Sequence, residues 1–117
     1  MTNSKKLVDA INHYVSIHGT DTIIDGRQIL NIAGLLKSRG NIFPSDYCYN
    51  RYNFGLRDFN GPFLFEYFGV GKYRVLGENY PYSGDIYHKP KGRNEVVVGK
   101  WENGRKIIYN DKLSSLR

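Results

Sequence analysis

The predicted fold depends on residues 43–55, which read Phe43-Pro44-Ser45-Asp46-Tyr47-Cys48-Tyr49-Asn50-Arg51-Tyr52-Asn53-Phe54-Gly55. Pro44 disfavours the α conformation at the residue before it, so it separates this stretch from what precedes it. Ser45 can cap a new helix and Gly55 can end it. We therefore predict a short helix over residues 45–54.

A helical wheel divides the side chains of this helix between two faces. Cys48, Tyr49 and Tyr52 share one face, which we expect to be buried. On the other face, asparagine can pair with adenine, and arginine with guanine or phosphate. The residues predicted to read bases are Tyr47, Asn50, Arg51 and Asn53. The alternative is that Asn50 and Asn53 only serve helix ends and a loop.

Before this stretch, apolar residues at spacings of three and four predict a helix over residues 5–18, capped by Ser4. A β-branched run at residues 20–24 indicates a short strand. Asp25 and Gln28 then stand in the spacing of a capping box.

The capping box begins a second predicted helix, over residues 26–39. Gly34 lies inside it, at a tolerable cost in helix propensity. Gly40 is the predicted stop.

After the central stretch, the apolar period changes to two. Residues 63–76 alternate around Gly69-Val70-Gly71, which predicts a β-hairpin. Further strands are predicted at residues 85–89, 95–101 and 106–109. Asn103-Gly104 supplies a hairpin turn between the last two. These strands form a predicted meander that could extend the sheet of the hairpin.

This order of helix, helix, helix and hairpin resembles winged helix-turn-helix DNA-binding domains over about residues 5–76. Residues 29–33 correspond to the support helix, residues 45–54 to the recognition helix and residues 63–76 to the wing. The resemblance implies an α+β fold with three N-terminal helices, a hairpin wing and a C-terminal β-meander. We expect a single domain, 1–117, made of a winged-helix core (5–76), a basic β extension (77–110) and a tail (111–117).

Positive charge is concentrated in the second half of the chain. The 117 residues carry a net charge of +6. Residues 1–71 hold seven basic and six acidic side chains, a net of +1, and residues 72–117 hold ten and five, a net of +5. Basic charge supplies the phosphate-neutralising part of nucleic-acid affinity. The predicted phosphate-binding residues are Lys72, Arg74, Lys89, Lys91 and Arg93.

These features predict a regulator of transcription, or of a phage or mobile element, whose partner is double-stranded DNA. A homodimer is left open. The alternative is a protein-interaction module, such as a phage-encoded inhibitor or adaptor that docks on a host nuclease or another nucleoprotein. Exposed aromatic residues suit interface hot spots. The candidates for such contacts are Tyr80, Tyr82, Tyr87 and Trp101.

Other classes of function are disfavoured. Cys48 is the only cysteine, so an intramolecular disulfide and a cysteine-rich zinc site are excluded, and we expect it to be a small buried hydrophobe. His88 lies among basic residues, yet clustered carboxylates for metal-dependent phosphodiester hydrolysis are missing beside it. No apolar run is long enough for a membrane span. We expect no enzyme activity, no cofactor, no metal, no membrane contact and a cytoplasmic location.

Overall fold

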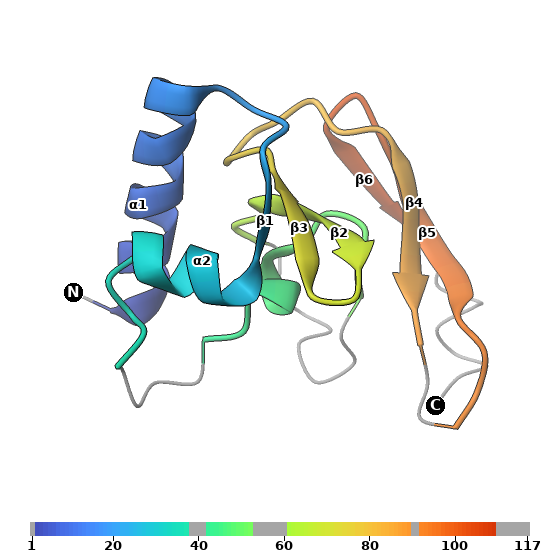
Figure 1. The fold of residues 1–117 in the computed structure, drawn as a ribbon. Helices are drawn as coiled ribbons and strands as arrows, with labels where there is room; N and C mark the ends of the chain where they lie inside the picture. The colour runs from blue at the N-terminus through green and yellow to red at the C-terminus, as the bar shows by residue number, and fades with distance from the viewer. Residues whose placement is uncertain (1, 38–41, 53–60, 90–91, 110–117) are drawn as a thin grey trace.

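The computed structural model describes residues 2–37, 42–52, 61–89 and 92–109, and Figure 1 shows their arrangement. The elements in chain order are α1 (Asn3–His18), β1 (Ile23–Asp25), α2 (Gly26–Ile32), the 3-10 helix η1 (Pro44–Tyr47), β2 (Phe65–Gly69), β3 (Lys72–Val75), β4 (Gly84–His88), β5 (Val96–Glu102) and β6 (Arg105–Ile108). The strands form two antiparallel sheets of three, in the orders β1-β3-β2 and β4-β5-β6. Neither α-helix is long and apolar enough to cross a membrane.

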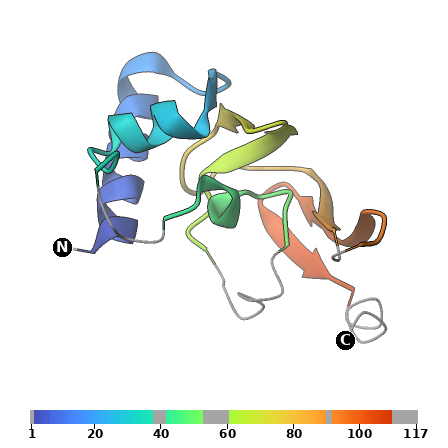
Figure 2. The ribbon, with the colours of Figure 1, turned by 60° about the horizontal axis from the view of Figure 1, so that its bottom comes forward.

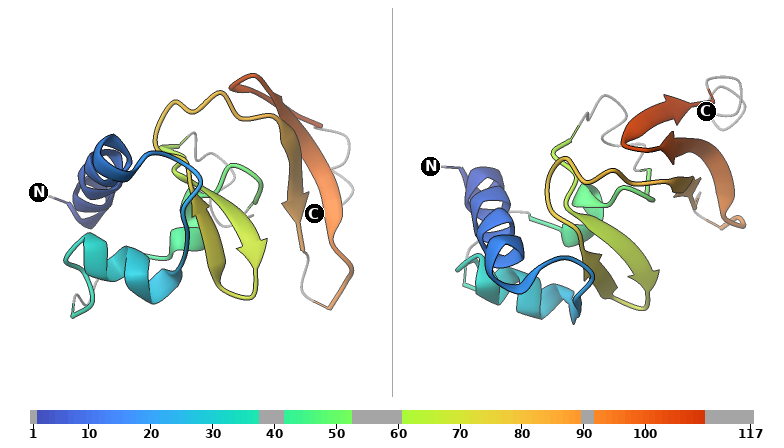
Figure 3. Two further views of the ribbon diagram at one scale, coloured as in Figure 1. Left: turned by 45° about the horizontal axis from the view of Figure 1, so that its top comes forward. Right: turned by 90° about the horizontal axis from the view of Figure 1, so that it is seen from above.

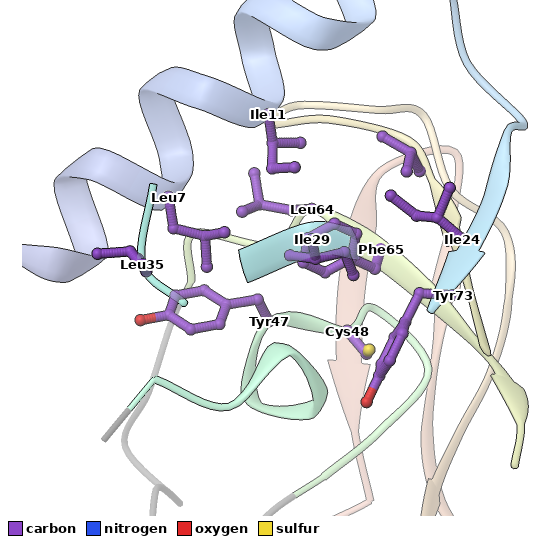
Figure 4. Packing of buried hydrophobic residues seen from close by; sticks show 11 residues of the cluster. Leu7, Ile11, Ile24, Ile29, Leu35, Tyr47, Cys48, Leu64, Phe65 and Tyr73 are labelled. Carbon is purple, nitrogen blue, oxygen red and sulfur yellow. The ribbon is translucent and has the colours of Figure 1, made fainter. Parts of the chain in front are cut away.

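Each sheet has its own cluster of buried side chains. The two helices lie on one side of the first sheet and the second sheet lies on its other side (Figures 2 and 3). Between the helices and the first sheet, the buried residues are Leu7, Ile11, Ile24, Ile29, Leu35, Tyr47, Cys48, Leu64, Phe65, Tyr73 and Val75 (Figure 4). Against the second sheet they are Tyr49, Leu76, Tyr82, Ile86, Val98 and Trp101. Residues 47–49 therefore contribute to both clusters.

The first helix is close to its predicted bounds. Its N-cap is Thr2 rather than Ser4, and the Thr2 hydroxyl accepts a hydrogen bond from the Lys5 amide at 3.1 Å. Gly19 ends it with a φ of 77°, a conformation that glycine adopts without steric cost.

The second helix begins as predicted but ends early. The Asp25 carboxylate accepts from the Gln28 amide at 2.8 Å, and the Gln28 side chain accepts from the Asp25 amide at 2.9 Å, so the capping box is confirmed. At the other end, the amides of Gly34 and Leu35 donate to the carbonyls of Asn31 and Leu30, the pattern of a Schellman motif. Gly34, with a φ of 71°, is thus the terminator and not an interior residue, and the prediction of a helix to residue 39 is wrong.

The predicted helix over residues 45–54 is also wrong. Only the short η1 forms, with Pro44 at its first position, and Cys48 is already extended, with a ψ of 133°. Residues 53 and 54 lie outside the described part of the chain. At Cys48 and Arg51, the backbone instead forms bridges with Phe65 of β2 and with Tyr87 of β4, one strand of each sheet.

The winged helix-turn-helix fold is contradicted by this architecture. The described residues contain two α-helices and six strands in two sheets, where the prediction had three helices before a wing. The hairpin itself is confirmed as β2 and β3, and the meander as β4, β5 and β6. The meander does not extend the first sheet, because it forms a sheet of its own. Asn103 and Gly104 make the β5–β6 turn with φ angles of 47° and 84°.

Candidate nucleic-acid interface

Residues 48–52, which we call the seam, connect the two sheets. The Tyr49 amide donates to the Phe65 carbonyl of β2 at 2.8 Å. Further along the seam, the Tyr87 amide of β4 donates to the Asn50 carbonyl at 3.0 Å, and the Tyr52 amide donates to the Tyr87 carbonyl at 2.8 Å. The seam therefore supplies backbone partners to one strand of each sheet.

Asn50 uses its side chain to hold strand β2. Its Oδ1 accepts from the Tyr67 amide at 2.8 Å, and its Nδ2 donates to the Tyr67 carbonyl at 3.0 Å. These two bonds imitate the pairing that a neighbouring strand would provide. The amide that was predicted to read a base is thus engaged inside the fold.

The other predicted base-reading residues are also placed by the structure. Tyr47 is buried, with 7% of its surface exposed. The Arg51 guanidinium is 2.6 Å from a carboxylate oxygen of Glu95 and 5.0 Å from the centre of the Tyr67 ring. Asn53 lies outside the described residues. The structure does not bring these side chains onto one exposed helical face, because the helix that would carry them does not form.

The predicted phosphate-binding residues divide into two groups. The Arg74 guanidinium is 2.8 Å from Glu66 through Nε and 2.8 Å from Asp21 through Nη1, so it stabilises the first sheet. Lys72, Lys89 and Arg93 are exposed, and Lys91 lies outside the described residues.

The three exposed cations, which we call the basic end, come from three strand ends. Lys72 is the first residue of β3, Lys89 follows the last residue of β4, and Arg93 precedes β5. In Figure 1 these strand ends lie at the same, lower end of the molecule. Lys72, Lys89 and Arg93 thus lie at one end of the fold, while Arg105 and Lys106 of β6 lie away from it.

A small polar pocket of about 200 Å³ lies where the seam meets the end of β4. It is lined by Ser45, Asp46, Arg51, Tyr52, His88 and Lys89. His88 is 9% exposed, and its Nδ1 is 3.0 Å from the Tyr52 carbonyl oxygen. Within the described ranges, no three histidine, cysteine, aspartate or glutamate side chains gather as a metal site.

Two of the four predicted protein-contact residues are buried. Tyr82 donates its hydroxyl to Glu66 at 2.5 Å, and burial, together with this bond, raises the pKa of Tyr82. The Trp101 indole donates to the Tyr49 carbonyl at 2.8 Å. Tyr80 and Tyr87 are half-buried. An exposed aromatic surface made of all four residues is therefore not present.

A second, larger pocket was not predicted from the sequence. It measures about 570 Å³ and is lined by residues that include Tyr49, Phe63, Glu78, Tyr80, Trp101 and Lys106. We call it the aromatic pocket. Its residues come from four separated segments, so no local spacing marks it. One signal was available in β6, where successive side chains alternate between the two faces of the sheet. Lys106 lies opposite Trp101 in this register, so the two side chains share a face.

Cys48 is confirmed as a buried residue. It has no exposed surface, and its thiol donates to the Pro44 carbonyl at a sulfur–oxygen distance of 3.6 Å. Burial raises the pKa of the Cys48 thiol, which keeps it protonated and unreactive in the folded state.

Comparison with known proteins identifies the family. The family described as "Domain of unknown function (DUF7225)" matches residues 6–108. The chain belongs to this family. It is also similar to "Uncharacterized protein YnaC" of Bacillus subtilis (strain 168), with 54% identity over 69 residues. That match covers 58% of this chain and 26% of YnaC. No solved structure matches the chain significantly.

Proposed function

We propose that the protein binds nucleic acid through the basic end, with Lys72, Lys89 and Arg93 in contact with phosphates. The observation that carries this proposal is that three exposed cations from three different strand ends lie at one end of the fold. Other cations of the second half are already paired: Arg74 with Glu66, and Lys100 with Glu102 at 2.5 Å. Among the described residues, the basic end is where three exposed cations without an ion pair come from neighbouring strand ends.

Contacts of this kind give affinity without sequence preference. Lysine and arginine release condensed counterions when they neutralise phosphates, and the gain is lost as salt increases. Base reading needs side chains that reach base edges in a groove. Asn50 is occupied by Tyr67 and Tyr47 is buried, so the proposal rests on the phosphate contacts alone.

The proposal is tested by anisotropy titration of a labelled duplex of mixed sequence. The variant combines Lys72→Gln, Lys89→Gln and Arg93→Gln. Arg105→Gln is the matched control, because Arg105 is exposed and follows the β5–β6 turn at the opposite end of the molecule. At low salt we expect the triple variant to bind at least about tenfold more weakly than wild type. Equal affinities of the triple variant and the control would contradict the proposal.

A second candidate, docking on a protein, is favoured by one separate observation. Phe68 is 59% exposed and Val70 is 96% exposed, both beside the β2–β3 turn. Exposed apolar side chains at a strand turn suit a protein contact. In this case wild-type protein should retain one stoichiometric partner after nuclease treatment, and Phe68→Asp should not. If wild type and Phe68→Asp both retain the partner, the β2–β3 turn does not make the contact.

A further inference from the structure

The aromatic pocket lies away from the basic end. Its rim includes Pro81, in the connection from β3 to β4, and Gly104, in the β5–β6 turn. Both of these segments lie at the opposite end of the molecule from the basic end (Figure 1). The volume of about 570 Å³ is in the range of pockets that bind small organic ligands, which is about 300–1,000 Å³.

Lys106 is the cation of this pocket. Its side chain is half-buried, and its ammonium nitrogen is 5.1 Å from the centre of the Phe63 ring. Among the described residues, no carboxylate forms an ion pair with it. Burial lowers the pKa of Lys106, since the charged form loses part of its hydration. An anionic ligand would supply the missing countercharge.

The walls of the pocket offer flat apolar surface. The Tyr49 hydroxyl donates to the Gly77 carbonyl at 2.8 Å and accepts from the Tyr80 amide at 3.1 Å. The Trp101 indole is likewise bonded within the wall. With these polar groups satisfied, the rings of the half-buried Tyr80 and Phe63 present their remaining surface to the pocket. Aromatic faces of this kind stack on nucleobases.

One carboxylate on the rim adds a polar partner. Glu78 accepts from the Asn12 side chain at 3.2 Å through Oε1, and the Asn12 Oδ1 accepts from the Glu78 amide at 3.1 Å. These bonds anchor the rim to α1. The second carboxylate oxygen of Glu78 can accept a hydrogen bond from a ribose hydroxyl or a base amino group.

We propose that the aromatic pocket binds a nucleoside monophosphate, with the base against Tyr80 and the phosphate at Lys106. A planar base joined to one anionic group matches the combination of aromatic walls and a single unshared cation. The ligand can be a free nucleotide or one nucleotide of a single strand. This site does not depend on the basic end, which lies at the other end of the fold.

Trp101 makes the proposal testable by fluorescence. It is the only tryptophan and it lines the pocket, so ligand binding should change its emission. We expect a saturable change with adenosine 5′-monophosphate. Lys106→Met should lower the affinity for adenosine 5′-monophosphate about tenfold, because one charge-assisted contact is lost. The affinity for adenosine, which has no phosphate, should not change. Arg105→Gln is the matched control. In the register of β5 and β6, Arg105 lies opposite Glu102, whereas Lys106 lies opposite Trp101, so neighbouring residues of β6 point to opposite faces of the sheet.

A short single-stranded oligonucleotide, compared with the mononucleotide, decides the source of the nucleotide. If the mononucleotide saturates the signal, a free nucleotide is the ligand. If a short single-stranded oligonucleotide saturates the signal and the mononucleotide does not, the pocket binds one nucleotide of a strand, provided that Lys106→Met weakens binding of the oligonucleotide too.

Three results would overturn the proposal: no saturable change with either ligand, equal effects of Lys106→Met and Arg105→Gln, or inorganic phosphate binding as well as the mononucleotide. The triple variant of the basic end should bind the mononucleotide like wild type, so this site and the proposed DNA contact fail or succeed separately.

Discussion

The side-chain amide of Asn50 is hydrogen-bonded to both backbone groups of Tyr67, at 2.8 Å to the amide and at 3.0 Å to the carbonyl. Tyr67 lies in β2, whose other side is already paired with β3. The Asn50 side chain thus hydrogen-bonds the amide and the carbonyl that Tyr67 exposes on the free edge of β2. The adjacent Arg51 adds a contact with the Tyr67 ring.

Removing this side chain should destabilise the fold. We expect Asn50→Ala to lower the free energy of unfolding by about 1–3 kcal/mol, because two half-buried backbone groups lose their partner. Urea denaturation measures the loss. Asn31→Ala, at an exposed position of α2, is the control and should change stability by no more than about 0.5 kcal/mol. A loss for Asn50→Ala as small as that of the control would show that the two bonds contribute nothing net.

Val70 occupies a conformation that suits asparagine better. Its φ is 50°, and β-branched residues rarely adopt positive φ. Val70→Asn creates an Asn-Gly pair with Gly71, the preferred sequence for a two-residue turn in which both φ angles are positive. We expect thermal and urea unfolding to show a gain of about 0.5–1 kcal/mol. Val70→Thr keeps the branching and should give no gain. If threonine stabilises as much as asparagine, the effect comes from polarity and not from the backbone.

Gly99 is required by the close approach of β6 to β5. A Cβ at this position would overlap with the carbonyl oxygen of Ile107 on the neighbouring strand. Gly99→Ala should therefore cost about 1–3 kcal/mol in urea denaturation. Gly26→Ala is the matched control, since a Cβ there lies 3.7 Å from the Tyr73 ring, an ordinary contact at the start of α2. The control should be neutral or stabilise the protein by up to about 1 kcal/mol. Equal losses in both variants would exclude the steric explanation.

Alkaline pH should destabilise the protein through its buried tyrosines. Burial raises the pKa of Tyr73 to about 12, and burial also raises the pKa of Tyr49. An unfolded tyrosine ionises near pH 10, so between about pH 10 and 12 the unfolded state binds fewer protons than the folded state, and stability falls as pH rises. For one tyrosine, the slope reaches about 1.4 kcal/mol per pH unit where the folded residue is protonated and the unfolded residue is ionised.

The contribution of one residue is isolated by Tyr73→Phe. Urea denaturation at a series of pH values should show a shallower decline for this variant than for wild type, by the slope of one tyrosine. Tyr14→Phe, on the half-buried surface of α1, serves as the control and should decline like wild type. If Tyr73→Phe follows the wild-type curve, Tyr73 does not hold its proton through this pH range.

The features that were predictable from sequence are those decided by near neighbours. The Asp25–Gln28 capping box, the β2–β3 hairpin and the Asn103-Gly104 turn each depend on residues within a few positions of one another. The prediction placed Gly34 inside the second helix and took Gly40 as the stop, whereas the helix ends at Gly34. The outcome was set by where Leu35 packs, in the buried cluster under α1.

The features that could not be predicted depend on distant partners. Residues 45–54 carry local signals for a helix, but the backbone of the seam finds partners at Phe65 and Tyr87, which are far away in sequence. The pairing of Arg74 with Asp21 likewise joins residues 53 positions apart, and it removes one cation from the predicted phosphate-binding set. Asn50 and Arg74, two residues predicted to contact DNA, make their contacts inside the fold, with Tyr67 of β2 and with Glu66 and Asp21.

The salt dependence of duplex DNA binding tests the proposed function most directly. For duplex DNA, each phosphate contact contributes about 0.9 to the slope of log affinity against log salt concentration. The account predicts that replacing Lys72, Lys89 and Arg93 together by glutamine lowers this slope by about 2 to 3, while Arg105→Gln leaves it at the wild-type value. A triple variant with the wild-type slope, or a wild-type protein with no measurable affinity for DNA at low salt, would contradict it.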